Sequence, residues 1–313
     1  MMYNVKRVIM TGATGAVGIP LIYELINNEV EVTVICRSES KRVVNIPQHP
    51  NVKIVEGDLK NLRSLKNTLL DKYDVFYHLG WDGTYGEARQ NLQLQLKNVQ
   101  YALDAVELAN CLECHTFIGV GSQGECGTTD GLISSSTACN PNTGYGSGKL
   151  AALHFTRIAC EKNNMKHVWC RIVSLFGCFD GEHTMVMSSL KGMLNGQVMS
   201  FTKGEQVWDY LYNKDAALAL RLLAEKGKHR SIYCLGSGNT RKLSDYITVM
   251  RDLINPELKI KIGEVKYYSN QAMYLKADIT NLIQDTGFKP QYSFEQGIQE
   301  TIQWIKERCK DEY

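Results

Sequence analysis

Apolar and polar residues alternate through the first part of the chain in short strand-like runs and longer helix-like stretches. Runs rich in β-branched residues predict strands at 5–11, 30–36, 52–55, 74–79, 115–121 and 167–173. Apolar residues that recur every three or four positions predict helices at 17–27, 92–109 and 143–161. This alternation predicts an α/β fold in which helices cover both faces of a doubly wound parallel sheet.

The alternation loosens in the remainder of the chain. Apolar spacing predicts helices at 185–194, 214–225, 243–253 and 294–307, and short strands near 207–211 and 231–235. No repeat, low-complexity tract or linker interrupts the sequence. We therefore predict a larger domain over residues 1–178, to which some later segments return. A smaller mixed α/β lobe over residues 179–313 should fold onto the ligand side of the sheet.

Size and composition exclude several classes of partner. A chain of 313 residues with 44% hydrophobic and 22% charged residues can bury a large core. Its formal net charge of +2 gives no overall attraction for a polyanion, so no nucleic-acid partner is predicted. No apolar run approaches the roughly 18 residues of a membrane helix, and the N-terminus leads straight into a strand rather than a targeting leader. We therefore predict a cytoplasmic protein without a membrane partner.

The ten cysteines are scattered, mostly within apolar segments, which predicts reduced and buried thiols. Cys111 and Cys114 have the spacing of a metal-binding pair, and His115 follows them directly. No second pair lies near them in the sequence, so a helix end that runs into a strand is favoured over a zinc site. We predict no metal.

A glycine-rich segment, Thr11 to Gly18, stands between the first predicted strand and the first predicted helix. Because Gly12, Gly15 and Gly18 have no side chains, the backbone can turn sharply and a pyrophosphate can approach its amide groups. The N-terminus of the helix adds unpaired N–H donors and partial positive charge. This pattern is typical of a Rossmann-type dinucleotide-binding domain. The predicted cofactor contacts in the turn are Gly12, Thr14, Gly15, Ala16, Val17 and Gly18.

The end of the second predicted strand bears on which dinucleotide binds. An acidic side chain there would bond the adenosine ribose of NAD, whereas this chain has Arg37 with no acidic residue beside it. A guanidinium can grip a 2′-phosphate, so we predict NADP, with NAD possible. The alternative is a solvated arginine that stacks on the adenine of either cofactor. Further cofactor contacts are predicted at Asp58, Leu59, Leu79 and Gly80.

Tyr145 and Lys149 lie four residues apart in a predicted helix and so share one face. A free tyrosine has a pKa of about 10, and a nearby ammonium should lower that pKa toward neutrality. Lys149 could also hydrogen-bond the nicotinamide ribose. Ser122 closes the fifth predicted strand, where its hydroxyl could orient a carbonyl group. These three residues are the predicted catalytic set for hydride transfer with nicotinamide, in which Tyr145 handles the proton.

Together these motifs resemble an extended short-chain dehydrogenase/reductase of the NAD-dependent epimerase/dehydratase family, which acts on nucleotide-linked sugars. The resemblance covers almost the whole length. Its motifs are the glycine-rich turn, Gly57-Asp58-Leu59, DVFYHLGW at 74–81, Asn98, Gly121-Ser122 with Gly127, YGSGK at 145–149, Gly287 to Pro290 and Trp304. It implies Ser122, Tyr145 and Lys149 as catalytic triad, Asn98 at the cofactor site in its supporting network, and a nucleoside diphosphate sugar as substrate. It also implies a homodimer paired through two long helices as a four-helix bundle.

Departures from the family pattern narrow the chemistry. Dehydratases of this family place an Asp-Glu pair after the catalytic hydroxyl residue, whereas this chain has Gln123-Gly124, so dehydration is disfavoured. Arg37 and the short second lobe favour a 4-ketoreductase that uses NADPH on a 4-keto-6-deoxy sugar nucleotide. The alternatives are an NAD-dependent 4-epimerase and a non-catalytic dinucleotide sensor. The predicted substrate contacts are Trp81, Gln123, Ser174 and Trp208.

Overall fold

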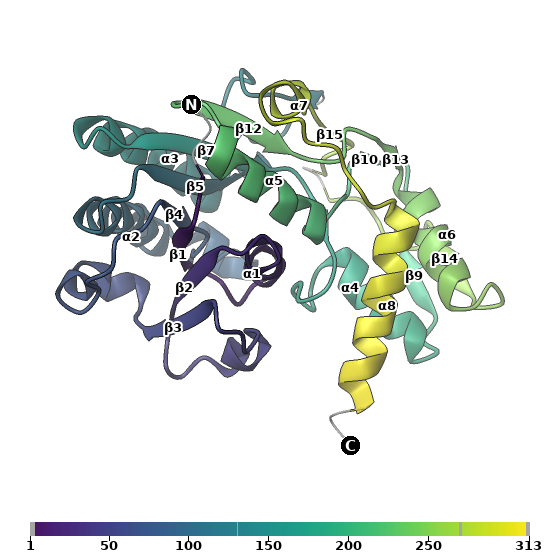
Figure 1. Ribbon diagram of the computed structural model, residues 1–313. Helices are drawn as coiled ribbons and strands as arrows, with labels where there is room; N and C mark the ends of the chain where they lie inside the picture. The colour runs from purple at the N-terminus through teal and green to yellow at the C-terminus, as the bar shows by residue number, and fades with distance from the viewer. Residues whose placement is uncertain (1–3, 130, 269–270, 311–313) are drawn as a thin grey trace.

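The computed structural model describes residues 4–129, 131–268 and 271–310, which form a large sheet-containing region and a smaller lobe beside it (Figure 1). The seven-stranded sheet has the order β12-β7-β5-β4-β1-β2-β3, and every neighbouring pair is parallel. Its strands are β1 (Arg7–Thr11), β2 (Glu31–Cys36), β3 (Val52–Glu56), β4 (Val75–His78), β5 (Thr116–Ser122), β7 (Lys166–Ile172) and β12 (Ser231–Leu235). The predicted α/β, Rossmann-type sheet is confirmed.

Helices cover both faces of this sheet, and strand residues alternate between the two faces. The covering helices are α1 (Gly18–Ile26) and α5 (Asn213–Lys226), which pack together, and α2 (Leu92–Cys111) and α3 (Gly144–Lys162), which form the second pair. In β1, Val8 and Met10 join the core that contains α1 and α5, whereas Ile9 joins the core that contains α2. All three side chains are fully buried, as expected in the middle of a parallel sheet.

The smaller lobe has its own aromatic core and is built mainly from the last third of the chain. Its helices are α4 (Met185–Leu194), α6 (Leu243–Ile254) and α8 (Phe294–Lys310). Its short strands include β9 (Met199–Phe201), β10 (Val207–Trp208), β13 (Arg241–Lys242), β14 (Ile260–Ile262) and β15 (Tyr274–Ala277), and β15 pairs with β6 (Leu132–Ile133). Phe176, Tyr210, Tyr246 and Phe294 pack ring against ring in the core.

Some later segments of the chain pack with the large region. β12 is the outer strand of the sheet, and α5 packs against α1. Later in the chain, between β15 and α8, α7 (Thr280–Thr286) contacts both α5 and β12. The two regions are therefore interleaved along the chain.

The predicted strand at 207–211 is wrong in detail because the chain bends within it. β10 is followed by a separate strand, β11 (Leu211–Tyr212), which pairs with β8 (Leu175–Phe176) in another sheet. Between them the buried Asp209 carboxylate accepts hydrogen bonds from three backbone N–H groups, those of Ser237, Gly238 and Ala277. These bonds turn the Asp209 carboxylate inward at the bend, so the strand ends earlier than the apolar pattern predicts.

The other unpredicted elements are short. Apart from α7 and strands of two to four residues such as β6, β9, β14 and β15, they are the 3₁₀ segments η1 (Lys41–Asn45), η2 (Leu59–Asn67), η3 (Gly86–Gln90) and η4 (Gln123–Glu125). Three of these segments have five residues or fewer, too few to show a helical repeat of apolar positions, and η2 is interrupted by the non-helical backbone of Asn61.

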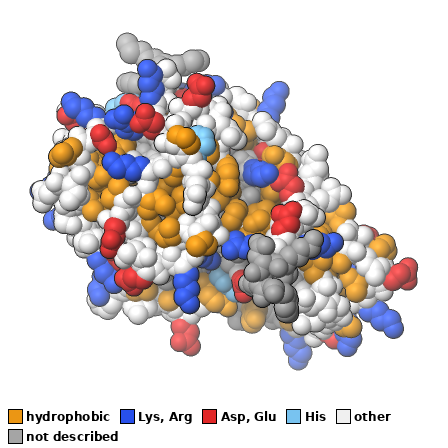
Figure 2. All heavy atoms as spheres, turned by 60° about the horizontal axis from the view of Figure 1, so that its bottom comes forward, with side chains coloured by type: hydrophobic (Ala, Val, Ile, Leu, Met, Phe, Trp, Pro, Cys, Tyr) orange, Lys and Arg blue, Asp and Glu red, His pale blue; other side chains and the backbone are white. Residues whose placement is uncertain are grey.

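Surface charge is mixed in sign on the face that Figure 2 shows, where Lys and Arg side chains are interspersed with Asp and Glu around a broad apolar area. Within the described ranges, no helix combines the length and apolar character needed to cross a membrane. The same residues include no group of His, Cys, Asp and Glu that could hold a metal ion. The nine cysteines whose side chains are described are free, and the side chain of Cys309 lies outside the described residues.

Candidate active site

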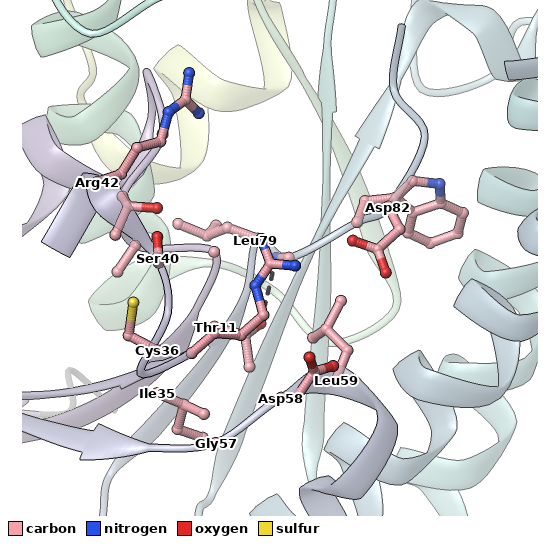
Figure 3. Close-up of a pocket in the computed structure, with 17 residues that line it drawn as sticks. Thr11, Ile35, Cys36, Ser40, Arg42, Gly57, Asp58, Leu59, Leu79 and Asp82 are labelled. Atoms are coloured by element: carbon pink, nitrogen blue, oxygen red, sulfur yellow. Dashed lines mark hydrogen bonds between the residues drawn. The ribbon is translucent and has the colours of Figure 1, made fainter. Parts of the chain in front are cut away.

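A cleft opens at the carboxyl ends of β1, β2, β3 and β4 (Figure 3), the edge at which doubly wound sheets bind ligands. It brings together predicted cofactor residues from four segments of the chain: Gly12, Thr14, Gly15, Arg37, Asp58, Leu59, Leu79 and Gly80. Trp81, a predicted substrate contact, lines the cleft as well. Ala16 and Val17 lead into α1 at Gly18, and Asn98 lies in α2, outside the lining.

Two glycines of the turn occupy positions where a side chain would collide with backbone. Gly12 has φ +71°, and a Cβ there would lie 2.4 Å from the Gly80 amide nitrogen. A Cβ on Gly18 would lie 2.4 Å from the backbone of Ala13. At Gly15, by contrast, the nearest atom would be a carbonyl oxygen 3.8 Å away. Gly15 therefore faces open space in the cleft, where a pyrophosphate can approach.

Basic and hydroxyl side chains gather where the cleft meets the end of β2. Arg37, Ser40 and Arg42 line it there, and both arginines are exposed. Figure 3 shows Ser40 and Arg42 across the cleft from Asp58 and Asp82. Only Arg37 of this cluster was predicted as a contact. The other two belong to the loop before η1 and to η1 itself, for which periodicity gives no signal.

The three predicted catalytic residues meet beside this cleft. Tyr145 and Lys149 project from the first turns of α3, and Ser122 ends β5. The side chains of Tyr145 and Ser122 are hydrogen bonded to each other. Lys149 Nζ donates a 2.7 Å hydrogen bond to the Val120 carbonyl and lies 5.9 Å from the centre of the Tyr145 ring.

The start of α3 is fixed closely against its neighbours. Thr143 caps the helix, since its Oγ1 accepts a 3.0 Å hydrogen bond from the Gly146 amide. A Cβ on Gly146 would lie 2.1 Å from the Gly124 carbonyl oxygen, and one on Gly148 would lie 3.2 Å from the Trp81 ring. Gly146 therefore lets the helix approach the residues after Ser122, and Gly148 lets it approach Trp81.

Lys149 is buried, and an indole ring covers its ammonium. Nζ lies 4.0 Å from the centre of the Trp81 ring, and Trp81 Nε1 donates a 2.8 Å hydrogen bond to Gln95 Oε1. Burial lowers the pKa of the ammonium to about 7, against an opposing effect of the Glu125 carboxylate. Trp81 therefore supports Lys149 as well as lining the cleft.

The expectation that Lys149 lowers the pKa of Tyr145 is not met in this structure. Burial raises the pKa of the phenol, the Ser122 hydroxyl and the Arg89 guanidinium lower it, and Glu125 raises it. Arg89 Cζ lies 4.5 Å from the centre of the Tyr145 ring, closer than Lys149 Nζ at 5.9 Å. The nearer cation is thus Arg89, which belongs to η3 and was not predicted.

The remaining predicted contacts do not line the cleft. Trp208 Nε1 donates a 3.0 Å hydrogen bond to Ser174 Oγ, and Gln123 is half-buried at the start of η4. The Asn98 amide accepts a 2.9 Å bond from the Asp82 N–H and donates a 2.8 Å bond to the Asp82 carbonyl. Asn98 therefore holds the wall of the cleft in place through Asp82.

Glu125 stands three residues after Ser122, but its carboxylate is committed to structure. It is fully buried, and Oε2 accepts a 3.0 Å ion-pair hydrogen bond from Arg171 Nε. Oε1 accepts bonds from Trp169 Nε1 at 3.0 Å and from the Ser122 amide at 2.8 Å. With its acceptors occupied, Glu125 shapes the turn after β5 and is not placed to exchange protons with a ligand.

A contact between the two regions was also missed. The rings of Tyr85, in the loop before α2, and His183, in the loop before α4, stack with centres 3.5 Å apart although both residues are exposed. Because Tyr85 and His183 lie far apart in the sequence, no local pattern of residues predicts that they stack.

A parallel sheet with a glycine-rich first turn and a Ser–Tyr–Lys set beside the resulting cleft defines an oxidoreductase-like enzyme that uses a dinucleotide. Residues 8–236 match the model of the NAD dependent epimerase/dehydratase family. The match covers most of the chain, and the chain belongs to that family. This membership is the family resemblance that the motifs predicted.

Curated and solved relatives are distant. The dTDP-glucose 4,6-dehydratase of Shigella flexneri is 24% identical over 180 residues, or 55% of this chain and 50% of the relative, so the match spans about half the length of that protein. An epimerase structure from Methanothermobacter thermautotrophicus has a TM-score of 0.88 at 20% identity and covers 98% of this chain and 94% of its own. The UDP-N-acetylglucosamine 4-epimerase of Methanobrevibacter ruminantium gives 0.87 at 22% identity, with 98% and 100% covered. At such identities the structural likeness bears on the fold alone.

Proposed function

We propose that this chain reduces the C4 ketone of a nucleotide-linked 4-keto-6-deoxy sugar with NADPH. One observation carries the proposal: the hydrogen-bonded Ser122 and Tyr145 stand with Lys149 beside a cleft suited to a dinucleotide. NADPH, when bound, supplies the hydride. Tyr145 donates the proton to the new alkoxide oxygen, Ser122 hydrogen-bonds that oxygen, and Lys149 holds the nicotinamide ribose.

Dehydration is a weaker candidate although the chain is similar to curated dehydratases. Elimination of water from the sugar needs an acid and a base near C5 and C6. The positions after Ser122 hold Gln123 and Gly124, and the next carboxylate, Glu125, is buried in its ion pair with Arg171. Gln123 can bind a substrate hydroxyl but cannot exchange a proton at neutral pH.

NADP is the proposed cofactor because the β2 end of the cleft offers donors for an extra phosphate. Arg37, Ser40 and Arg42 line it together, and a guanidinium pair with a hydroxyl suits three phosphate oxygens. The NAD-bound structures similar to this chain include a UDP-glucuronic acid 4-epimerase from Bacillus cereus. The comparison therefore supports NAD for the family, whereas this chain's own residues favour NADP.

A second candidate is NAD-dependent 4-epimerisation of a nucleoside diphosphate sugar, which the likeness to 4-epimerases favours. The same residues would serve it. Tyr145 would accept the proton of the C4 hydroxyl as the sugar is oxidised and return it after the keto sugar turns over. The same catalytic residues suit one hydride transfer to the sugar and a transfer that is later reversed. A reductase consumes its nicotinamide cofactor and an epimerase regenerates it, so consumption of the cofactor distinguishes the two candidates.

We also propose a homodimer in which α2 and α3 pair with the same helices of a second copy. The two helices pack on each other, and each exposes large apolar side chains. Leu96 of α2 is 62% exposed, and Phe155 and Ile158 of α3 are each 50% exposed. Exposed apolar residues on two adjacent helices suit a bundle of four.

The test is to incubate the purified protein with NADPH or NADH and a panel of keto sugar nucleotides. A reductase consumes NADPH in equal amount to a product that has gained two hydrogen atoms. An epimerase instead retains NAD through purification and interconverts C4 epimers without net change in nicotinamide absorbance. Consumption of neither cofactor and no epimerised product from any sugar nucleotide would contradict both candidates.

Tyr145→Phe tests the assigned proton donor. The variant should lose about 100-fold or more in turnover, since general acid catalysis contributes at least that much. Cofactor affinity should change little because the ring remains. Normal turnover in this variant would remove Tyr145 from the mechanism.

A further inference from the structure

We propose that Arg89 is a positioning residue that holds a permanent positive charge against the Tyr145 ring and so opposes the effect of burial on its hydroxyl. The inference rests on the proposed function, in which Tyr145 exchanges a proton with the substrate. The Arg89 guanidinium carbon lies 4.5 Å from the ring centre. A guanidinium at this distance attracts the ring face, and it attracts a phenolate more strongly than a phenol.

Lys149 does not meet this need in the structure. Its ammonium is directed to the Val120 carbonyl at 2.7 Å and to the Trp81 ring at 4.0 Å. Because burial lowers its pKa to about 7, Lys149 is only partly protonated near neutral pH. A guanidinium stays protonated at any pH at which the protein is folded. Arg89 is therefore the dependable charge beside Tyr145.

The segment that carries Arg89 is anchored to the helix that carries Tyr145. Gln90 Oε1 accepts a 3.1 Å hydrogen bond from the Gly144 amide at the first residue of α3. Gln95 of α2 donates a 2.9 Å bond to the Ala88 carbonyl. Arg89 Nη1 itself donates to the Thr84 carbonyl at 3.3 Å. These bonds fix both ends of η3, so the guanidinium is held over the ring by its own loop.

Three charged groups lie near Tyr145 among the described residues, and Arg89 carries a positive charge that does not depend on pH. Arg89 approaches from η3, Lys149 from the next turn of α3, and Glu125 from η4. Glu125 opposes the phenolate, and Arg171 already engages its carboxylate. Without Arg89, burial and the Glu125 carboxylate would raise the pKa of the phenol, and the Ser122 hydrogen bond would oppose them.

The experiment is an ultraviolet difference titration of the Tyr145 phenol, which needs no substrate. Each protein is titrated beside its own Tyr145→Phe derivative, so that the difference isolates one phenol among the 16 tyrosines. Removing the charge with Arg89→Met should move the ionisation of Tyr145 up by about one pH unit, a tenfold smaller ionisation constant. Arg89→Lys should give a smaller upward shift than Arg89→Met, because lysine keeps a cation near the ring but lacks the planar guanidinium.

Glu87→Gln, an exposed substitution in the same segment, is the matched control and should leave the titration unchanged. Identical titrations of wild type and Arg89→Met would overturn the proposal. So would an equal shift in Glu87→Gln, or a wild-type phenol that does not ionise before the fold is lost. If no sugar nucleotide is turned over, the proposed function fails while the titration still decides the role of Arg89. If turnover is found, a purely structural role predicts equal loss at every pH in Arg89→Met, whereas the charge role predicts a displaced pH profile.

Discussion

Lys149 shows how burial changes a residue that sequence alone would treat as a simple cation. Its ammonium is enclosed by a backbone carbonyl and an indole ring, and burial lowers its pKa to about 7. A lysine of this kind can lose its proton at neutral pH, which an exposed lysine cannot. Its charge state is therefore sensitive to pH near neutrality, and the hydrogen bond proposed between Lys149 and the nicotinamide ribose should share that sensitivity.

The depressed pKa of Lys149 predicts a pH dependence of stability. The unfolded chain, with a lysine pKa of 10.5, binds more protons than the folded one between that pH and about 7. Stability should therefore rise with pH across this window. Relative to Lys149→Met, wild type should gain up to about 3 kcal/mol between about pH 7 and about pH 9.5. Urea denaturation of both proteins at the two pH values measures this, and a constant difference would show that the buried ammonium keeps its ordinary pKa.

The turn between β1 and α1, the proposed cofactor-binding element, contains three glycines in different surroundings. At Gly12 the backbone is left-handed and touches Gly80, and at Gly18 it touches Ala13. Gly15 has room around it and lines the cleft. Gly12 and Gly18 thus serve the folding of the turn, whereas Gly15 leaves room for a ligand to approach.

Alanine substitutions should separate these two tasks. Gly12→Ala should lower the free energy of unfolding by at least about 2 kcal/mol, because a strained φ is combined with a backbone clash. Gly15→Ala should change that free energy by less than about 1 kcal/mol. Both should weaken dinucleotide binding, since the added methyl group of Gly15→Ala projects into the cleft. Thermal unfolding without ligand and fluorescence titration with NADPH measure the two effects, and equal stabilities would refute the assignment.

The loop from β2 to η1 makes its own prediction about cofactor choice. Arg37→Ala should weaken NADPH binding by about tenfold or more, as expected for loss of a charge-assisted hydrogen bond to phosphate, and should affect NADH far less. Lys41→Ala is the matched control, since Lys41 is exposed in the same loop but does not line the cofactor cleft. Equal losses for the two cofactors on Arg37→Ala would leave no basis for NADP.

Sequence predicted the long elements well because their apolar spacing is repeated over several turns. The bounds of α4, Met185 to Leu194, were predicted to the residue, and the pairing of Tyr145 with Lys149 follows from spacing within one helix. Arg89 could not be found in this way. It reaches Tyr145 through a five-residue 3₁₀ segment and a hydrogen bond between Gln90 and Gly144, which are 54 positions apart. Contacts of that range leave no periodic trace in a single sequence.

At the scale of the whole molecule, the two regions are built from interleaved segments. α4, α6 and α8 belong to the smaller lobe, whereas α5 and β12, which lie between α4 and α6, belong to the large sheet. Asn213 at the start of α5 ties them together, because its amide donates to the Ala16 carbonyl at 3.0 Å and to the Cys178 carbonyl at 2.7 Å. The cofactor turn and the start of the smaller lobe thus share one anchoring side chain.

Assembly is the prediction at this scale. Placing charges on the exposed apolar face with Leu96→Glu and Phe155→Glu should convert a dimer into monomers, because buried charges in a helix bundle are costly. Leu70→Glu, at a side chain that is 88% exposed near the end of η2, is the control and should leave the dimer intact. Analytical ultracentrifugation measures both, and a monomeric wild type would exclude the proposed pairing.

The interleaving limits how new specificity could be acquired or engineered. A chimera that joins the first half of this protein to the second half of a homologue would import a foreign β12 into the seven-stranded sheet. To exchange only the smaller lobe, a recombination experiment must transplant three separate stretches around α4, α6 and α8. Natural divergence faces the same constraint, so selectivity in such a scaffold is expected to drift by point substitution rather than by shuffling whole modules.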